Sequence, residues 1–144
     1  MNANAHGPFV VGIDGSDCAI AALDAAVELG APTAAPIVAV FVRHHPGTLA
    51  ASTVATAAHH LALESVTNDI EAELLTRLAD YPGQWRFDAR EGDPEHQLIE
   101  AAEQHGARMV IVGHRGHNPV TERFAGSVAA GLVHHCPISV LVAR

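Results

Sequence analysis

The chain has 144 residues and a formal net charge of −8, with 16 acidic residues against 8 basic ones. All the basic residues are arginine, which excludes a Walker A phosphate loop and a Schiff-base enzyme, because both need a lysine. An acidic chain without a basic cluster also argues against a nucleic-acid partner.

The composition favours one domain over residues 1–144. Hydrophobic residues make up 49% of the chain and aromatic residues only 4%, so the core must be aliphatic. No apolar run approaches the roughly 18 residues of a membrane span, and residues 1–8 lack the features of a secretion signal. Cys18 and Cys136 stand outside any Cys-x-x-Cys pattern and are typical of small buried side chains in a reducing compartment. We therefore expect a cytoplasmic protein without a membrane partner.

Short apolar runs alternate with helical patterns along the chain. The apolar runs predict strands over residues 9–13, 37–42, 109–113 and 137–142, and the partly alternating residues 84–90 predict an edge strand. Helices are expected between them, from about residue 16 to 30, from 52 to 80, after Asp93 as a cap, and from 127 to 135. Such alternation predicts an α/β fold with a parallel sheet. Ligands of these sheets bind beyond the carboxyl ends of the strands, where strand order reverses.

Two of these helices carry apolar stripes that should face the sheet. Apolar residues three or four positions apart lie on one side of a helix. In the middle helix the stripe is Leu63, Val66, Ile70, Leu74 and Leu78, and in the last helix it is Val128, Leu132 and Val133.

The segment after the fourth strand has the spacing G-x2-G-x9-G-S over residues 113–127. Gly113 and Gly116 permit close approach of a ligand to the backbone. Gly126 and Ser127 open a helix, whose first N–H groups can bind a phosphate. The pattern also fits a glycine-containing turn followed by a capping serine.

Other side chains of this segment could assist an anion. Arg115 and Arg123 add positive charge, and His114 and His117 either contact phosphates or are simply solvated. The chain has eleven histidines, but their adjacent pairs are poorly placed for two ligands to one metal. We expect no dedicated metal site, although Mg²⁺ could accompany nucleotide phosphates.

The motifs together resemble the universal stress protein family in its ATP-binding branch. The glycine spacing follows a strand, as in that family, and residues 11–16, 91–94 and 135–142 are similar to its other landmarks. The resemblance runs in order from about residue 8 to 143.

The resemblance implies a Rossmann-like fold of the adenine-nucleotide α-hydrolase type, with a five-stranded parallel sheet of order 3-2-1-4-5 and helices on both faces. It implies ATP as the ligand. Asp14 would lie near the adenosine, although it could instead be a turn residue or a helix cap. The backbone of Val42 would meet the adenine. The ribose and phosphates would be held by Gly113, Gly116, Gly126, Ser127 and the N–H of Val128.

These features predict an ATP-binding regulatory or stress-response protein with an unknown protein partner. The apolar closing strand should lie at a sheet edge and pair with a second copy, as the resemblance also implies. One alternative is a slow ATPase or nucleotidyl-transfer enzyme, for which Glu122 is the nearest acid that could orient water. Another is a dimeric interaction module with a vestigial site. No catalytic residue is assigned, and we expect at most very slow hydrolysis.

Overall fold

The computed structural model describes residues 6–43, 53–115 and 126–144. Its core is one parallel sheet, and the observed order is β3-β2-β1-β4-β5, which confirms the predicted topology. The strands are β1 (Phe9–Ile13), β2 (Ile37–Arg43), β3 (Trp85–Glu91), β4 (Met109–Gly113) and β5 (Ser139–Ala143).

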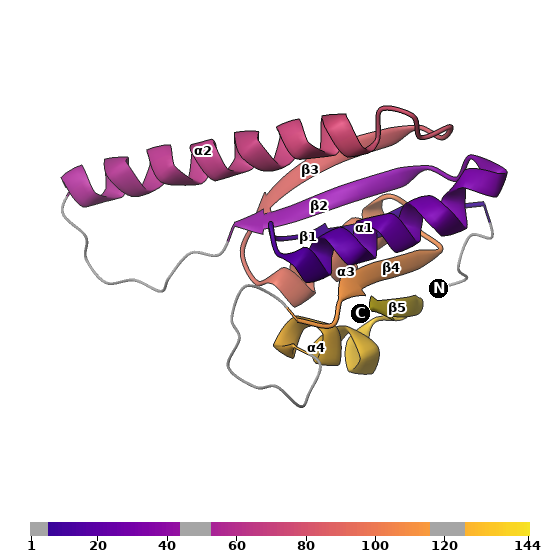
Figure 1. Ribbon diagram of the computed structural model, residues 1–144. Helices are drawn as coiled ribbons and strands as arrows, with labels where there is room; N and C mark the ends of the chain where they lie inside the picture. The colour runs from indigo at the N-terminus through magenta and orange to yellow at the C-terminus, as the bar shows by residue number, and fades with distance from the viewer. Residues whose placement is uncertain (1–5, 44–52, 116–125) are drawn as a thin grey trace.

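Helices cover both faces of the sheet, as predicted (Figure 1). On one face, Leu23 and Leu74 of two helices pack on β1 and β2; on the other, Leu98 and Leu132 of two further helices pack on β1 and β4. The helices are α1 (Asp17–Gly30), α2 (Thr53–Arg77), α3 (Pro94–Gln104) and α4 (Ser127–His135), with a 3-10 turn η1 (Ala31–Thr33) after α1. None of the described helices combines the length and hydropathy that a bilayer crossing requires.

Side-chain caps fix where two helices begin. The Ser16 hydroxyl accepts a hydrogen bond from the Ala19 N–H at 3.2 Å, at the start of α1. The Asp93 carboxylate accepts from the His96 N–H at 3.0 Å, and Pro94 occupies the first helical position of α3. Both caps satisfy an N–H that has no partner inside the helix. The predicted cap at Asp93 is therefore confirmed.

The predicted apolar stripes are only partly buried. Ile70, Leu74 and Leu78 are buried, but Val66 is 45% exposed. Figure 1 shows the first turns of α2 extending past the end of β2, so that part of the helix has no sheet beneath it. In α4, Leu132 is buried while Val133 is 59% exposed, because adjacent residues on a helix point about 100° apart.

At the amino end of the sheet, Tyr81 ties the turn after α2 to the start of β2. Its hydroxyl donates a hydrogen bond to the Ala35 carbonyl. Burial raises the pKa of the Tyr81 phenol, and the nearby charge of Arg108 opposes that rise. Gly30 makes room for this hydroxyl, since an added Cβ would meet it at 2.2 Å. The phenol therefore stays a neutral donor near pH 7.

The two cysteines differ from expectation in their burial. Both are free thiols, and both are partly exposed rather than fully buried. Cys18 lies in the first turn of α1 and Cys136 caps the carboxyl end of α4.

Candidate functional site

The strand order places a switch point between β1 and β4. From β1 the chain passes through α1 to β2 on one side, whereas α3 delivers the chain to β4 on the other side. The two crossovers therefore diverge between β1 and β4, and ligands of such sheets bind beyond the carboxyl ends of the strands at this point. Several of the candidate residues lie at this end of the sheet.

Asp14 follows β1 and shapes the turn into α1. One oxygen of its carboxylate accepts hydrogen bonds from the Ser16 N–H at 2.9 Å and the Ser16 hydroxyl at 2.5 Å. Gly15 completes this turn with a φ of +81°, a conformation that glycine adopts without strain. Asp14 is thus a turn residue, while Ser16 is the cap. Since both bonds use the same oxygen of a half-buried carboxylate, the other oxygen is available to a ligand.

Gly113 ends β4 in close contact with the first turn of α1. A Cβ at this position would lie 2.5 Å from the backbone carbonyl of Cys18. This contact brings the end of β4 next to the start of α1, and thus next to the Asp14 turn. Gly113 therefore has a packing role in addition to any contact with a ligand.

The backbone of His114 joins three elements at the carboxyl end of the sheet. Its N–H donates to the Ala143 carbonyl of β5 at 2.8 Å, and its carbonyl accepts from the Gly126 N–H at 2.5 Å. The second bond fixes the residue before α4 directly beside the end of β4. The described segments on both sides of residues 116–125 are therefore anchored to one another.

The amino end of α4 is open to an anion. Its cap is Gly126, which has no side chain to satisfy the first N–H groups of the helix. The Gly126 carbonyl accepts the first helical bond from the Ala130 N–H at 2.9 Å. Ser127 is exposed and Val128 is half-buried. The N–H groups of this first turn and the positive end of the helix dipole suit a phosphate group.

The main chain of Val42 faces the space beyond the end of β1. The Arg43 carbonyl accepts from the Gly92 N–H at 3.1 Å, so residue 43 turns its backbone polar groups toward the β3 side. Successive residues of a strand alternate, which turns those of Val42 toward the β1 side. The pairing of β1 with β2 ends at Ile13 opposite Phe41. The Val42 carbonyl therefore points past the last paired residue of β1.

The structure thus brings most of the predicted site residues to one end of the sheet. They are Asp14, Val42, Gly113, Arg115, Gly126, Ser127 and Val128. Gly116, His117, Glu122 and Arg123 lie outside the described residues.

Arg43 was not among the predicted site residues. One of its terminal nitrogens, Nη2, lies 3.1 Å from Oε1 of Glu91, at the end of the neighbouring strand β3. Its Nε is buried and has no hydrogen-bond partner. The signal in the sequence was an arginine directly after the apolar run 37–42, at the predicted ligand-binding end of the sheet.

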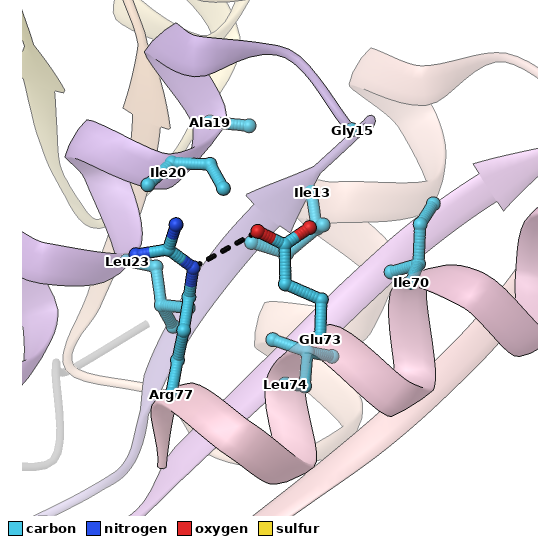
Figure 2. Close-up of a pocket in the computed structure, with 9 residues that line it drawn as sticks. All are labelled: Ile13, Gly15, Ala19, Ile20, Leu23, Ile70, Glu73, Leu74 and Arg77. Carbon is cyan, nitrogen blue, oxygen red and sulfur yellow. Dashed lines mark hydrogen bonds and ion pairs between the residues drawn. The ribbon is translucent and has the colours of Figure 1, made fainter.

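A small pocket between α1 and α2 lies beside this site but is chemically unlike it (Figure 2). Arg77 and Glu73 form an ion pair at one side of the pocket, with Nε and Oε1 3.0 Å apart. A terminal nitrogen of Arg77 is also 3.9 Å from Asp24, so two acids neutralise this arginine. The remaining wall is Ile13, Gly15, Ala19, Ile20, Leu23, Ile70 and Leu74. Such an apolar wall and a neutralised arginine do not suit a phosphate.

A metal centre built by the protein alone is not seen in the described residues. Within residues 6–43, 53–115 and 126–144, no three His, Cys, Asp or Glu side chains gather into a group that could hold a metal ion.

Comparison with known proteins identifies the family. The sequence profile of the universal stress protein family matches residues 7–144. The chain belongs to the universal stress protein family. It is 28% identical to universal stress protein YxiE of Bacillus subtilis, over 92% of this chain and 97% of that protein.

Solved structures of universal stress proteins share the fold. UspA from Lactobacillus plantarum superposes with a TM-score of 0.82 at 23% identity, over 98% of this chain and 100% of that one. A universal stress protein in complex with cAMP gives 0.69 at 21% identity, over 98% of each chain. One from Archaeoglobus fulgidus in complex with dAMP gives 0.57 at 20% identity, over 98% of this chain and 100% of that one.

Proposed function

We propose that this universal stress protein binds ATP at the carboxyl end of its sheet and acts as a nucleotide-dependent regulatory protein in a stress response. The observation that carries the proposal is the open amino end of α4, which the bond between the Gly126 N–H and the His114 carbonyl fixes beside β4. Backbone N–H groups at a helix start are donors for phosphate oxygens that need no lysine.

The other end of the ligand would lie over β1 and β2. The Val42 carbonyl is an acceptor that points past the end of β1, and adenine carries an amine that can donate to it. Asp14 lies between Val42 and α4, where a ribose would cross from the base to the phosphates. The cAMP and dAMP complexes of two proteins with this fold support the class of ligand.

Mg²⁺ could accompany the phosphates. A magnesium ion prefers oxygen ligands and keeps several waters, so it needs few protein groups. The second carboxylate oxygen of Asp14 is of the right chemical type. The ion would neutralise part of the phosphate charge, and so reduce the repulsion between the phosphates and a protein whose net charge is −8.

Gly126→Val tests the location of the site. Gly126 has φ −53° and ψ 159°, which valine can also adopt, so we expect the variant to fold. The branched side chain would occupy the space in front of the first N–H groups of α4. We expect calorimetry to show a loss of ATP affinity of about tenfold or more, the size of one lost charge-assisted hydrogen bond.

The matched control is Gly106→Asn. Gly106 lies in a left-handed turn just before the amino end of β4, away from the proposed site, and an added Cβ there meets nothing within 4 Å. Asparagine tolerates that conformation, so ATP binding should be unchanged. Mass spectrometry of the nucleotide released on denaturing the wild-type protein identifies the resident ligand. Unchanged ATP affinity in folded Gly126→Val would place the phosphates elsewhere.

We also propose that the protein is a cytoplasmic homodimer that pairs through β5. The strand is at the edge of the sheet, and none of its five residues is charged. Edge strands without charges or proline readily pair with another chain.

A further inference from the structure

A groove at the amino end of the sheet gathers aromatic side chains. It is lined by the start of β3 and by Pro8 and Pro36, which come just before β1 and β2. Its wall contains the only tryptophan and the only tyrosine of the chain, Trp85 and Tyr81, and one of the four phenylalanines, Phe87. Such aromatic residues are enriched where proteins bind one another. The groove lies at the opposite end of the strands from the proposed nucleotide site.

The charge of this groove is opposite to that of the whole protein. The exposed Arg86 and the half-buried His105 both line it, and among the described residues of its wall none is acidic. The chain as a whole has 16 acidic residues and a net charge of −8. Asp88 lies 3.4 Å from His105, but it also accepts from Nε of Arg90 at 2.9 Å, so its charge is already paired. The groove therefore suits an acidic ligand.

The edge of β3 adds backbone donors and acceptors to the groove. Strand β3 is the last strand on its side of the described sheet. The Ile37 N–H donates to the Gln84 carbonyl at 2.9 Å, so residue 84 turns its backbone groups toward β2. Because successive residues of a strand alternate, those of Trp85 and Phe87 turn outward. An extended chain can pair with these outward groups.

The side chains of β3 define what such an extended chain should carry. Trp85 and Phe87 pack toward the sheet face that α1 and α2 cover. Arg90 bonds Gln104 of α3 on the other face, and alternation places Arg86 on that face too. A strand added beside β3 alternates in the same way, so its residues on one face meet the aromatic rings and those on the other meet Arg86. Apolar residues should therefore alternate with acidic ones.

We infer that this groove is an interaction site for an extended segment of another protein, in which apolar residues alternate with Asp or Glu, and which pairs with the outer edge of β3. The inference goes beyond the proposed function and does not depend on nucleotide binding. The uncharged edge of β5 suits a second copy, whereas the charge at Arg86 selects a different partner by complementarity.

The single tryptophan makes a local test possible, because Trp85 lies in the wall of the groove. The experiment titrates the protein with the heptapeptide Val-Glu-Val-Glu-Val-Glu-Val and follows the fluorescence of Trp85, with calorimetry as a second measurement. Three further probes are compared with it. They are the same peptide with Lys in place of Glu, the non-alternating peptide Val-Val-Glu-Glu-Val-Val-Glu, and oligothymidylate. We expect saturable binding of the alternating acidic peptide, and an affinity about tenfold or more lower for each other probe.

Charge reversal at Arg86 tests which surface is used. Arg86→Glu should weaken binding of the acidic peptide about tenfold or more, since like charges across an interface repel. The matched control is Arg144→Glu, which changes the net charge equally at an exposed residue beyond β5, at the other end of the sheet. It should bind as the wild type does, and Arg86→Lys should keep most of the binding. If thermal melts show that Arg86→Glu is unfolded, Arg86→Gln takes its place.

Several results would overturn the inference. One is that neither fluorescence nor calorimetry detects binding of the acidic peptide. Another is that the Lys peptide or the non-alternating peptide binds as tightly, or that Arg86→Glu and Arg144→Glu bind alike. Preference for oligothymidylate would make the groove a nucleic-acid surface instead. Because the two sites lie at opposite ends of the sheet, failure of the protein to bind ATP would reject the proposed function and leave this inference standing.

Discussion

At the scale of single residues, Gly113 shows how a ligand motif can also serve packing. The glycine spacing predicts a phosphate-binding segment, and Gly113 lies at the carboxyl end of β4, where a ligand is expected. The structure adds that any side chain here would strike the backbone of Cys18 in α1. The same residue therefore allows the sheet and α1 to approach, which in turn positions the Asp14 turn.

We predict that Gly113→Ala destabilises the fold. A Cβ placed 2.5 Å from a backbone carbon and oxygen cannot be accommodated by rotating a flexible side chain, so strand or helix must move. The expected loss is about 1–3 kcal/mol of unfolding free energy, the usual range for overpacking. Urea denaturation measures it, with Gly106→Asn as the near-neutral control. If Gly113→Ala is as stable as the wild type, Gly113 has no packing role and only its contact with a ligand remains.

At the scale of elements, the two edge strands differ in how they are protected. Strand β3 carries Arg86, Asp88 and Arg90, and Asp88 accepts from Nε of Arg90 at 2.9 Å. Arg90 also donates to Gln104 of α3 at 2.6 Å, so charges cover that edge. Strand β5 has the sequence SVLVA and no charge. The contrast favours pairing of β5, rather than β3, with a second copy.

Val140→Pro tests the proposed dimer without breaking the sheet. The Ala143 carbonyl accepts from the His114 N–H, so residues 139, 141 and 143 turn their backbone groups toward β4. The backbone groups of Val140 therefore face outward. Proline there removes an outward donor, and proline is tolerated on edge strands. We expect a folded monomer by analytical ultracentrifugation.

Leu141→Pro is the contrasting variant, because it removes an N–H that faces β4 and should destabilise the protein itself. A dimer that survives Val140→Pro would mean that the copies meet through another surface. If the wild-type protein is a monomer at high micromolar concentration, the proposed dimer is wrong.

At the scale of the whole molecule, the arrangement suits binding better than chemistry. The candidate donors are backbone N–H groups, which stabilise ATP itself as much as any transition state. At the carboxyl end of the sheet, Asp14 bonds Ser16 through one carboxylate oxygen, Glu91 pairs with Arg43, and Asp93 caps α3. Catalysis of phosphoryl transfer would need a group that orients the attacking water.

We therefore predict that hydrolysis of bound ATP is far slower than the roughly 1–1000 turnovers per second of typical enzymes. Single-turnover measurements with labelled ATP should show the nucleotide persisting for minutes or longer. Glu122→Gln is the informative variant. Fast phosphate release that disappears in this variant would identify a catalytic residue and favour the enzyme alternative.

Much of this protein was determined by its sequence alone. Five strand segments separated by helical patterns were enough for a parallel α/β sheet, because right-handed crossovers join such strands, and the resemblance to the universal stress protein family supplied the strand order that is observed. The cap at Asp93 and the start of α4 were also predicted, because they depend on residues within a few positions of one another.

The tertiary structure decided what depends on distant segments. Val66 and Val133 are exposed although both belong to predicted apolar stripes, and helical spacing does not contain the information about which of these residues the sheet covers. The contact of Gly113 with Cys18 and the pairing of Arg43 with Glu91 likewise join residues far apart in the chain. Local patterns fix where strands and helices begin, whereas only packing decides which side chains meet at the carboxyl end of the sheet.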